Sequence, residues 1–280
     1  MSSFRTSSLF RFCSEFEMLK KVLKNGIYPN YCEEDLSFSS IDFKIGIPMV
    51  SFCDIPITLL DEHHNRYGVY GLGLKKEWGF ANGITPIMYV SNENVLSSVY
   101  YHVSAGRKLL DKVNSKEYKD EAIMQTIISG FPFDKYIEAS EADRKHEINT
   151  HIVGYLKKYK SEYKNKEIIN YTENEWRYII PDTSDTPWFW SHDEYVKWRS
   201  PDGKDECPKP FPTDPLISNG LRFSVDDINY IIVKDEFKDR LIDFLRNVKS
   251  FGGANGSLSE KELLSIVSRI ITIEQVKNDF

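Results

Sequence analysis

Two acidic residues separated by one position stand out near the middle of the chain, in the segment Tyr171-Thr-Glu-Asn-Glu-Trp-Arg-Tyr-Ile-Ile180. Its β-branched and aromatic residues predict a strand, and the period of two in a strand places Glu173 and Glu175 on one face. Neighbouring carboxylates on a strand repel each other, so folding alone gives little reason for the pair. A cleft that stabilises a developing positive charge gives a functional reason. The structural alternatives are a solvated edge strand, or acids neutralised by Arg177 or a lysine.

An arginine and a serine on two earlier predicted strands could share a site with these acids. Arg11 lies between Phe10 and Phe12 in a short apolar run, and the fork of its guanidinium group suits a phosphate or pyrophosphate. Ser51 lies in the run 45–53, directly before Phe52. The structural alternatives are a solvated edge charge for Arg11 and an ordinary hydrogen-bonded hydroxyl for Ser51, and the sequence leaves both open.

These residues must be positioned by a core of mixed secondary structure. Period-two and apolar runs predict strands at 9–13, 45–53, 70–74, 86–90, 171–180 and 228–233. A helix is expected after the first strand, ending near Gly26, and amphipathic helices are expected at 237–248 and 259–270. The pattern is helical from about 92 to 163. Residues 181–220, rich in Pro, Asp, Ser and Trp, predict a long surface loop.

The order of these elements predicts an α+β fold in a single domain over 1–280. The segments 1–91 and 171–280 would form a mixed sheet core, and 92–170 would be a helical insertion. No Pro/Gly-rich linkers set the insertion apart, so we do not expect it to be a separate domain. A chain of 280 residues is long enough for a substantial core.

Composition excludes several classes of protein. The net charge of −6 argues against broad binding to phosphate backbones, although a specific nucleic-acid substrate stays open. The 4 cysteines form no CxxC pair, which disfavours a zinc site or a redox dithiol. There is no signal-peptide core and no apolar run of about 18 residues, so we expect a soluble, cytoplasmic protein without membrane contact.

The common motifs of cofactor and catalytic sites are missing. The sequence holds no P-loop, no GxGxxG between a strand and a helix, no HExxH and no GxSxG. Gly71-Leu-Gly73 is better explained by tight strand packing. His63 and His64 are adjacent, so on a helix they would point about 100° apart and could not easily share a metal.

Arg11 on a first strand, Ser51 on a middle strand and Glu173-x-Glu175 on a later one resemble the Arg–Ser–Glu arrangement of NAD-dependent ADP-ribosyltransferases. The opening strand and helix also resemble the DarT-like transferases, which commonly have His-x-Thr where this chain has Arg11-Phe12-Cys13. The resemblance implies a split β-sheet core and NAD as cofactor. Arg11 is assigned to the first-strand position of this arrangement by its register in the strand, and Arg5 is the alternative residue for that position.

The resemblance also implies roles for individual residues. Glu175 would stabilise the oxocarbenium-like transition state through the ribose 2′-OH, and Glu173 would orient or deprotonate the acceptor. Ser51 would fix the nicotinamide ribose or order Glu175. The cofactor-binding residues would be Arg11 on the phosphates, with Tyr67 and Tyr70 stacking on the nicotinamide ring.

A second resemblance covers more of the chain. The segments 26–34, 47–56, 67–78, 173–177 and 273–280 are similar to the AbiGi family of abortive phage-resistance proteins, which is labelled an antitoxin family. This implies a role in phage defence within a toxin–antitoxin system, with a cognate toxin or antitoxin protein as partner.

The sequence observations are compatible with three functions. The first is an ADP-ribosyltransferase that modifies a protein or nucleic-acid acceptor in abortive infection. The second is a non-catalytic antitoxin that binds and neutralises a partner toxin. The third, carried by fewer residues, is a metal-dependent nuclease that uses Asp54, Glu173 and Glu175. Convergence of Arg11, Ser51 and Glu175 in one cleft would favour the first.

Overall fold

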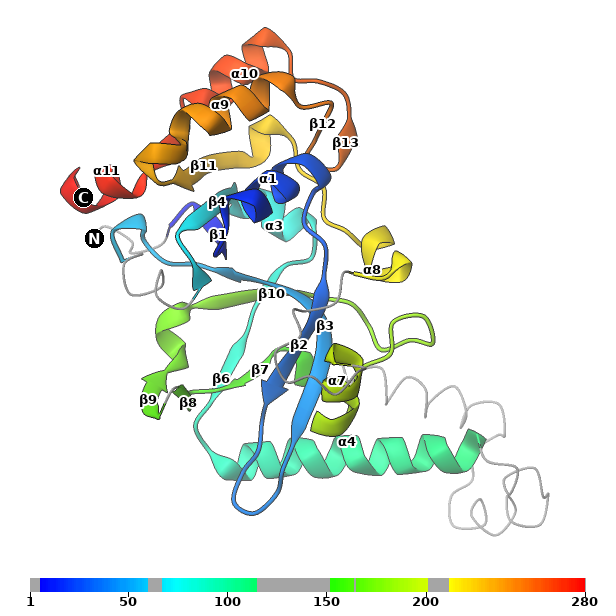
Figure 1. Ribbon diagram of the computed structural model, residues 1–280. Helices are drawn as coiled ribbons and strands as arrows, with labels where there is room; N and C mark the ends of the chain where they lie inside the picture. Colours follow the sequence, from blue (N-terminus) through cyan, green and yellow to red (C-terminus); the bar gives the residue numbers. More distant parts are fainter. Residues whose placement is uncertain (1–5, 60–66, 115–151, 164, 201–211, 280) are drawn as a thin grey trace.

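The computed structural model describes residues 6–59, 67–114, 152–163, 165–200 and 212–279 (Figure 1). Over these residues the protein is a mixed α/β structure with one eight-stranded sheet and three two-stranded sheets. None of the helices in these ranges is long and apolar enough to cross a membrane. Arg5, the His63–His64 pair and Cys207 lie outside the described residues.

The main sheet contains most of the predicted strands. Its order is β14-β11-β4-β1-β3-β10-β5, and β2 pairs with β3 outside this path. Neighbouring strands are antiparallel, whereas β11 and β14 are parallel. The strands are β1 (Ser8–Cys13), β2 (Asn30–Asp35), β3 (Lys44–Cys53), β4 (Tyr70–Lys75), β5 (Thr85–Pro86), β10 (Glu175–Ile179), β11 (Ile228–Val233) and β14 (Ile270–Thr272).

The long strand β3 divides the sheet. On one side, its C-terminal half pairs with β10, from Met49↔Ile179 to Cys53↔Glu175. Its other neighbours are β2, which pairs with residues 44–49, and β1, which meets it at Phe10↔Cys53. Residues 50–52 of β3 therefore pair with neither β1 nor β2. The sheet opens at this point, and Ser51 lies in the opening.

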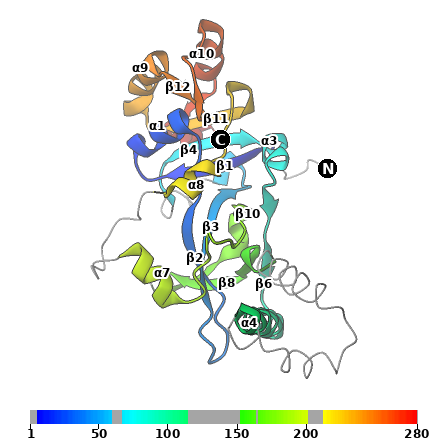
Figure 2. The same cartoon turned by 90° about the vertical axis from the view of Figure 1, so that its right-hand side faces the viewer.

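Helices cover the part of the sheet around β4 and β11. The helices α1 (Phe16–Asn25), α9 (Lys238–Asn247) and α10 (Glu260–Val267) lie together above these strands (Figures 1 and 2). Leu72 on β4 and Leu241 on α9 are fully buried in the core that they share. On the opposite face, α11 (Ile273–Asp279) joins the smaller cluster that contains Phe10 and Phe12.

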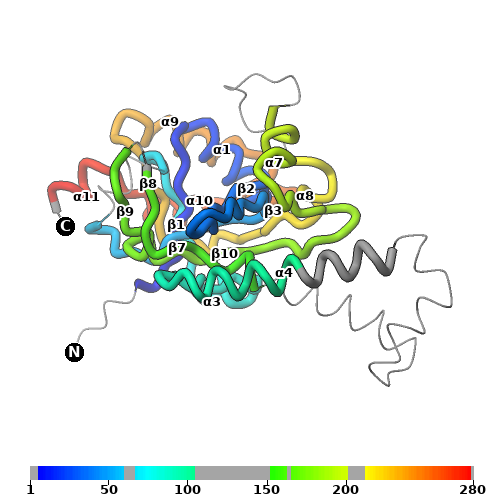
Figure 3. Tube along the Cα trace, turned by 90° about the horizontal axis from the view of Figure 1, so that it is seen from below, coloured from blue at the N-terminus to red at the C-terminus, as the bar shows by residue number. Residues whose placement is uncertain are grey.

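A second core lies at the other end of the molecule. The N-terminal half of β3 packs with α4 (Glu93–Asn114), which extends along the lower side of the protein (Figures 1 and 3). Ile45, Ile47, Leu96 and Leu156 are buried there. This second core fixes the strands that form the lower wall of the opening.

Two regions differ from the sequence prediction. Residues 156–169, expected to be helical, form β7 (Leu156–Lys158), β8 (Lys160–Tyr163) and β9 (Lys166–Ile169). Here β7 pairs with β6 (Met88–Val90) and β8 pairs with β9, so strand pairing overrides a weak helical pattern.

The expected long loop at 181–220 contains α7 (His192–Arg199) and α8 (Asp214–Ser218). Ser191 caps α7 by accepting a hydrogen bond from the Glu194 backbone N–H, a local signal that supports a helix at this point. The remaining short elements are α3 (Lys76–Ala81), β12 (Ser250–Phe251), β13 (Ala254–Asn255), η1 (Ile57–Leu59), η3 (Asn170–Glu173), η4 (Val225–Asp227) and η5 (Asp235–Phe237).

The glycines of β4 lie beneath aromatic rings of β1, in agreement with the predicted tight packing. Gly71 pairs with Phe12, and Gly73 pairs with Phe10. A Cβ atom on Gly73 would lie 2.8 Å from the Phe10 ring, closer than side-chain atoms normally approach. A side chain at this position would therefore displace the ring.

We predict that Gly73→Ala lowers the free energy of unfolding by about 1–3 kcal/mol in a urea titration. Without this contact, alanine would be the more stable residue in a strand interior. Because the conflict is with the Phe10 ring, adding Phe10→Leu should give a loss smaller than the sum of the two single losses. Additive losses would contradict the packing explanation.

Candidate functional site

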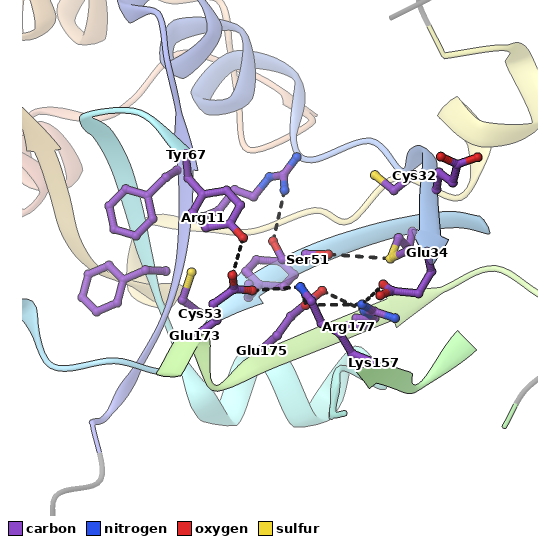
Figure 4. A pocket seen from close by; sticks show the side chains of 15 residues that line it. Arg11, Cys32, Glu34, Ser51, Cys53, Tyr67, Lys157, Glu173, Glu175 and Arg177 are labelled. Atoms are coloured by element: carbon purple, nitrogen blue, oxygen red, sulfur yellow. Dashed lines mark hydrogen bonds and ion pairs between the residues drawn. The ribbon is translucent and has the colours of Figure 1, made fainter. Parts of the chain in front are cut away.

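A pocket lies where the main sheet opens beside residues 50–52. Its cavity volume is about 170 Å³, which is smaller than the usual range of small-molecule sites. The predicted site residues Arg11, Ser51, Tyr67, Glu173 and Glu175 all line it (Figure 4). Side chains from distant parts of the sequence therefore come together in one place.

Arg11 points from β1 into the opening of the sheet. Its Nη1 donates a hydrogen bond to the Ser51 backbone carbonyl at 3.1 Å. Among the described residues, no carboxylate forms an ion pair with Arg11. The guanidinium group is thus oriented by β3 and retains donors for an anionic ligand.

The backbone conformation that places the two acids in the pocket differs from the predicted strand. Glu173 ends the 3-10 helix η3, Asn174 has a left-handed backbone with φ of 44°, and Glu175 begins β10. The expected strand therefore starts at Glu175 instead of Tyr171. Asparagine tolerates this conformation, and the end of β3 holds it, since the Asn174 carbonyl accepts from the Asp54 N–H at 3.0 Å.

Lys157 bridges the two acids. Its Nζ lies 2.9 Å from Glu173 Oε2 and 2.8 Å from Glu175 Oε2. The second oxygen of Glu173 accepts a hydrogen bond from the Tyr67 hydroxyl at 2.8 Å. The side chains of Glu173 and Glu175 are only 3% and 7% exposed, so these contacts form in a largely water-free environment.

Arg177 pairs with Glu175 and Glu34 and joins three elements. Its Nε donates to Glu175 Oε1 at 2.7 Å, and its Nη2 pairs with Glu34 on β2. Its Nη1 donates to the backbone carbonyls of Gly154, at 2.7 Å, and Leu156, at 3.3 Å. The structural alternative named from the sequence, acids paired with Arg177 or a lysine, is therefore the arrangement that the protein adopts.

These contacts set the charge of the cluster. Burial alone would raise the pKa of Glu175, but Arg177 and Lys157 hold that pKa well below its usual range. Burial would lower the pKa of Lys157, yet Glu175, Glu34 and Glu173 hold it above its usual value. The pKa of Glu34 is raised, because its burial outweighs the attraction of Arg177 and Lys157. Glu175 and Lys157 therefore stay ionised at neutral pH.

Cys53 lies beside the acids and remains a thiol. Burial, and then the negative charges of Glu173 and Glu175, raise the pKa of Cys53 to about 12. Because the thiolate is the nucleophilic form, this cysteine is not a nucleophile at neutral pH.

Tyr70 does not belong to the pocket, contrary to the prediction. It is 5% exposed and packs in the core, with its ring 5.8 Å from that of Phe16 and 5.7 Å from that of Phe237. The alternation of β4 turns Tyr70, like Leu72, towards the core that contains α1. Tyr67, which precedes the strand, is 37% exposed at the pocket.

The donor set of the proposed nuclease is not assembled. Asp54 forms an ion pair with Lys76 at 2.7 Å and accepts a hydrogen bond from the Thr6 hydroxyl at 2.6 Å. In the described part of the chain, no three His, Cys, Asp or Glu side chains are grouped to hold a metal ion. The acids are instead organised around Lys157 and Arg177.

Glu34 and Lys157 also line this site, although neither was predicted from the sequence. Glu34 lies on β2, a strand that was not predicted, and Lys157 lies in a segment that was expected to be helical. The available signal was Arg177 itself, because a charged residue inside a buried strand needs partners of opposite charge.

The fold and the site together describe a mixed α/β protein with an open pocket above a buried cluster of ion pairs. The family model "Putative abortive phage resistance protein AbiGi, antitoxin" matches residues 25–234, well over half of the chain, and the chain belongs to this family. It is also similar to the abortive phage resistance protein AbiGi of Lactococcus lactis subsp. cremoris. The identity is 28% over 270 residues, which cover 90% of this chain and 98% of the relative. No solved structure matches the chain.

We predict that Arg177→Met lowers the free energy of unfolding by about 3–5 kcal/mol, because it leaves Glu175 and Glu34 buried without their shared cation. Arg11→Met is the matched control and should cost far less, since Arg11 has no carboxylate partner among the described residues. Urea titrations of both variants make the comparison. Equal losses would show that the buried cluster does not carry the stability assigned to it.

Proposed function

We propose that this protein acts in phage defence as an NAD-dependent ADP-ribosyltransferase that modifies a protein or nucleic-acid target. The observation that supports this most strongly is the convergence of Arg11, Ser51 and Glu175 in one pocket. They come from three different strands, β1, β3 and β10, at the point where the sheet opens. The proposed fold is the split sheet of the ADP-ribosyltransferases.

The distribution of charge in the pocket suits NAD. Arg11 lies on one side of Ser51 and the two acids lie on the other (Figure 4). A pyrophosphate is negative, and a nicotinamide ring joined to ribose is positive. Arg11 would therefore bind the phosphates, and Glu173 and Glu175 would face the cationic end.

The reaction requires stabilisation of positive charge at the ribose. When the bond between C1′ and the nicotinamide nitrogen breaks, its electron pair leaves with nicotinamide and C1′ becomes electron-poor. Glu175 would accept a hydrogen bond from the ribose 2′-OH and stabilise that charge. This role requires an ionised carboxylate, and Arg177 and Lys157 keep Glu175 ionised by lowering its pKa.

The remaining residues would complete the transfer. Glu173 would orient the acceptor and take its proton as the acceptor forms a bond to C1′. Ser51 would fix the nicotinamide ribose, and Tyr67 would stack on the nicotinamide ring while its hydroxyl holds Glu173. In this scheme the products are free nicotinamide and an ADP-ribosylated acceptor.

A second candidate is a non-catalytic antitoxin that binds a partner toxin. The family description uses the word antitoxin, and Lys157 and Arg177 already engage both oxygens of Glu175. In that case the ion pairs would serve the fold alone, and the pocket would not turn over NAD. Fold alone does not decide between the two functions.

We predict that wild-type protein releases nicotinamide from NAD and that Glu175→Gln lowers the rate by about 10²–10³-fold. Glu34→Gln is the matched control: it changes the other carboxylate partner of Arg177 and should lower stability, yet retain most of the activity. Thermal melting of each variant confirms that the assay measures folded protein. If wild type and Glu175→Gln release nicotinamide equally, or Glu34→Gln loses as much activity as Glu175→Gln, the role of Glu175 is wrong.

We also predict that Arg11→Ala weakens NAD binding by about 10–100-fold, the loss expected for a charge-assisted hydrogen bond to phosphate. Calorimetry measures the affinity, and Arg246→Ala, on the exposed surface of α9, is the control. A drop in turnover with unchanged NAD affinity would contradict the phosphate-binding role.

A further inference from the structure

The backbone N–H of Glu175 is bonded to a tyrosine side chain instead of a neighbouring strand. It donates a hydrogen bond to the hydroxyl oxygen of Tyr89, on β6, at 2.7 Å. The carbonyl of Glu175 accepts from the N–H of Ile87 at 3.1 Å. Because Glu175 is only 6% exposed, its N–H would be buried and unpaired without this partner, which is costly. The Tyr89 hydroxyl therefore satisfies a backbone group that water hardly reaches.

The pairing of β5 with β10 shows which bond the tyrosine replaces. Both residues of β5 pair with β10, and the same register places Glu175 opposite Ile87. In a hydrogen-bonded pair of an antiparallel ladder, the two opposite residues exchange both of their N–H···O=C bonds. Between these two residues, only the bond from the Ile87 N–H to the Glu175 carbonyl is formed. The hydroxyl of Tyr89 takes the place of the Ile87 carbonyl as acceptor of the returning bond.

The replacement is possible because the chain changes its partner at this point. From Met88 onwards it pairs in parallel with β7 instead of β10, and Tyr89 lies opposite Lys157. Opposite residues on paired strands project from the same face, so the two side chains lie next to each other. Both reach Glu175: the Lys157 Nζ lies 2.8 Å from its Oε2, and the Tyr89 hydroxyl lies 2.7 Å from its backbone nitrogen. This residue is thus held at its main chain and at its carboxylate from the same small sheet.

The ring of Tyr89 is held in turn by two further tyrosines. It packs edge-on against Tyr171, with ring centroids 5.4 Å apart, and Tyr171 stacks on Tyr159 at 5.8 Å. Burial raises the pKa of Tyr89, so its hydroxyl is neutral at physiological pH and adds no charge beside the acids. The hydroxyl is therefore a neutral acceptor in a fixed place.

We propose that Tyr89 is a positioning residue that fixes the start of β10 and thereby holds the Glu175 carboxylate at one place in the pocket. Asn174, directly before it, has a left-handed backbone, so β10 begins immediately after a turn. A catalytic group displaced by roughly 1 Å can lose about 10²-fold in rate. The catalytic part of this inference rests on the proposed transferase function, whereas the hold of Tyr89 on Glu175 does not. Tyr89 acts through Glu175 and needs no contact with NAD.

The test compares wild type with Tyr89→Phe and Tyr31→Phe. Phenylalanine keeps the ring and removes only the hydroxyl. Tyr31 is the matched control, because its hydroxyl also forms a 2.7 Å hydrogen bond with the main chain, at the Pro187 carbonyl. Each variant loses one such bond, but only Tyr89→Phe loses a bond to Glu175. Thermal melting of all three proteins sets a temperature at which each is folded.

The first readout is hydrogen exchange at the Glu175 amide, which needs no NAD. NMR of protein that contains isotope-labelled glutamate measures it, and the signal is assigned by its absence in Glu175→Gln. We expect exchange about 5–10-fold faster in Tyr89→Phe than in wild type, the factor that corresponds to one lost hydrogen bond, and an unchanged rate in Tyr31→Phe. Equal rates in wild type and Tyr89→Phe would overturn the proposal.

The second readout is the kinetics of nicotinamide release. Tyr89→Phe should lower kcat about 10-fold and change the KM for NAD by less than about 2-fold, because the residue positions Glu175 without binding the ligand. Tyr31→Phe should keep the wild-type kcat. A raised KM with unchanged kcat in Tyr89→Phe, or an equal loss of kcat in both variants, would also overturn the proposal. If wild type releases no nicotinamide, the transferase function fails, and the exchange comparison still decides whether Tyr89 holds Glu175.

Discussion

The buried guanidinium group of Arg177 is the interaction on which the pocket depends. Its side chain is 1% exposed, and a charge in such a place must be paired and its donors used. Glu34, Glu175 and the carbonyls of Gly154 and Leu156 meet this need. Three segments far apart in sequence, β2, β7 and β10, are therefore tied to one side chain, and none can move away without exposing an unpaired buried charge.

The opening of the main sheet gives this cluster access to a ligand. Because β3 pairs with β2 along one half and meets β1 only near its end, residues 50–52 border a gap. Arg11 enters the gap from above, and the acids close it from below (Figure 4). A pocket with an available cation on one side and ionised carboxylates on the other suits a ligand that carries both signs of charge. This complementarity is why we favour NAD over an uncharged ligand.

Membership of an abortive phage resistance family is compatible with two different roles for this pocket. A transferase would use the acids on a ribose, whereas an antitoxin would use the same ion pairs only to hold its fold. The arrangement of Arg11 favours the first. A guanidinium group oriented by the Ser51 carbonyl, without a carboxylate partner among the described residues, contributes little to the fold and has donors to offer a ligand.

Strands with strong apolar patterns could be predicted from the sequence, and so could five residues that line the pocket, namely Arg11, Ser51, Tyr67, Glu173 and Glu175. The runs around Arg11 and Ser51 are typical of strands, and their side chains point where that periodicity puts them. Tyr70 was misplaced because the sequence did not show which face of β4 packs beneath α1. The strand β7 depends on pairing with the distant strand β6, which local patterns do not encode, whereas β8 and β9 are adjacent in sequence and pair with each other. The single domain and the extent of the insertion at 92–170 stay predictions.

The turn at Asn174, within the site itself, was also not predicted from the sequence pattern. Two acids with one residue between them suggested a strand, but the left-handed backbone at Asn174 and its carbonyl's contact with the Asp54 N–H define a turn instead. Both acids still line the pocket, and Lys157 forms an ion pair with each of them. Glu34 could not be linked to them from sequence, since only the folded sheet brings β2 next to Arg177.

A crystal structure of the protein with NAD tests the central claim most directly. We expect NAD in this pocket, with its pyrophosphate within hydrogen-bond distance of the Arg11 guanidinium group and the 2′-OH of its nicotinamide ribose beside Glu175. NAD bound elsewhere on the protein, or a pocket that stays empty at saturating NAD, would contradict it and favour the antitoxin function.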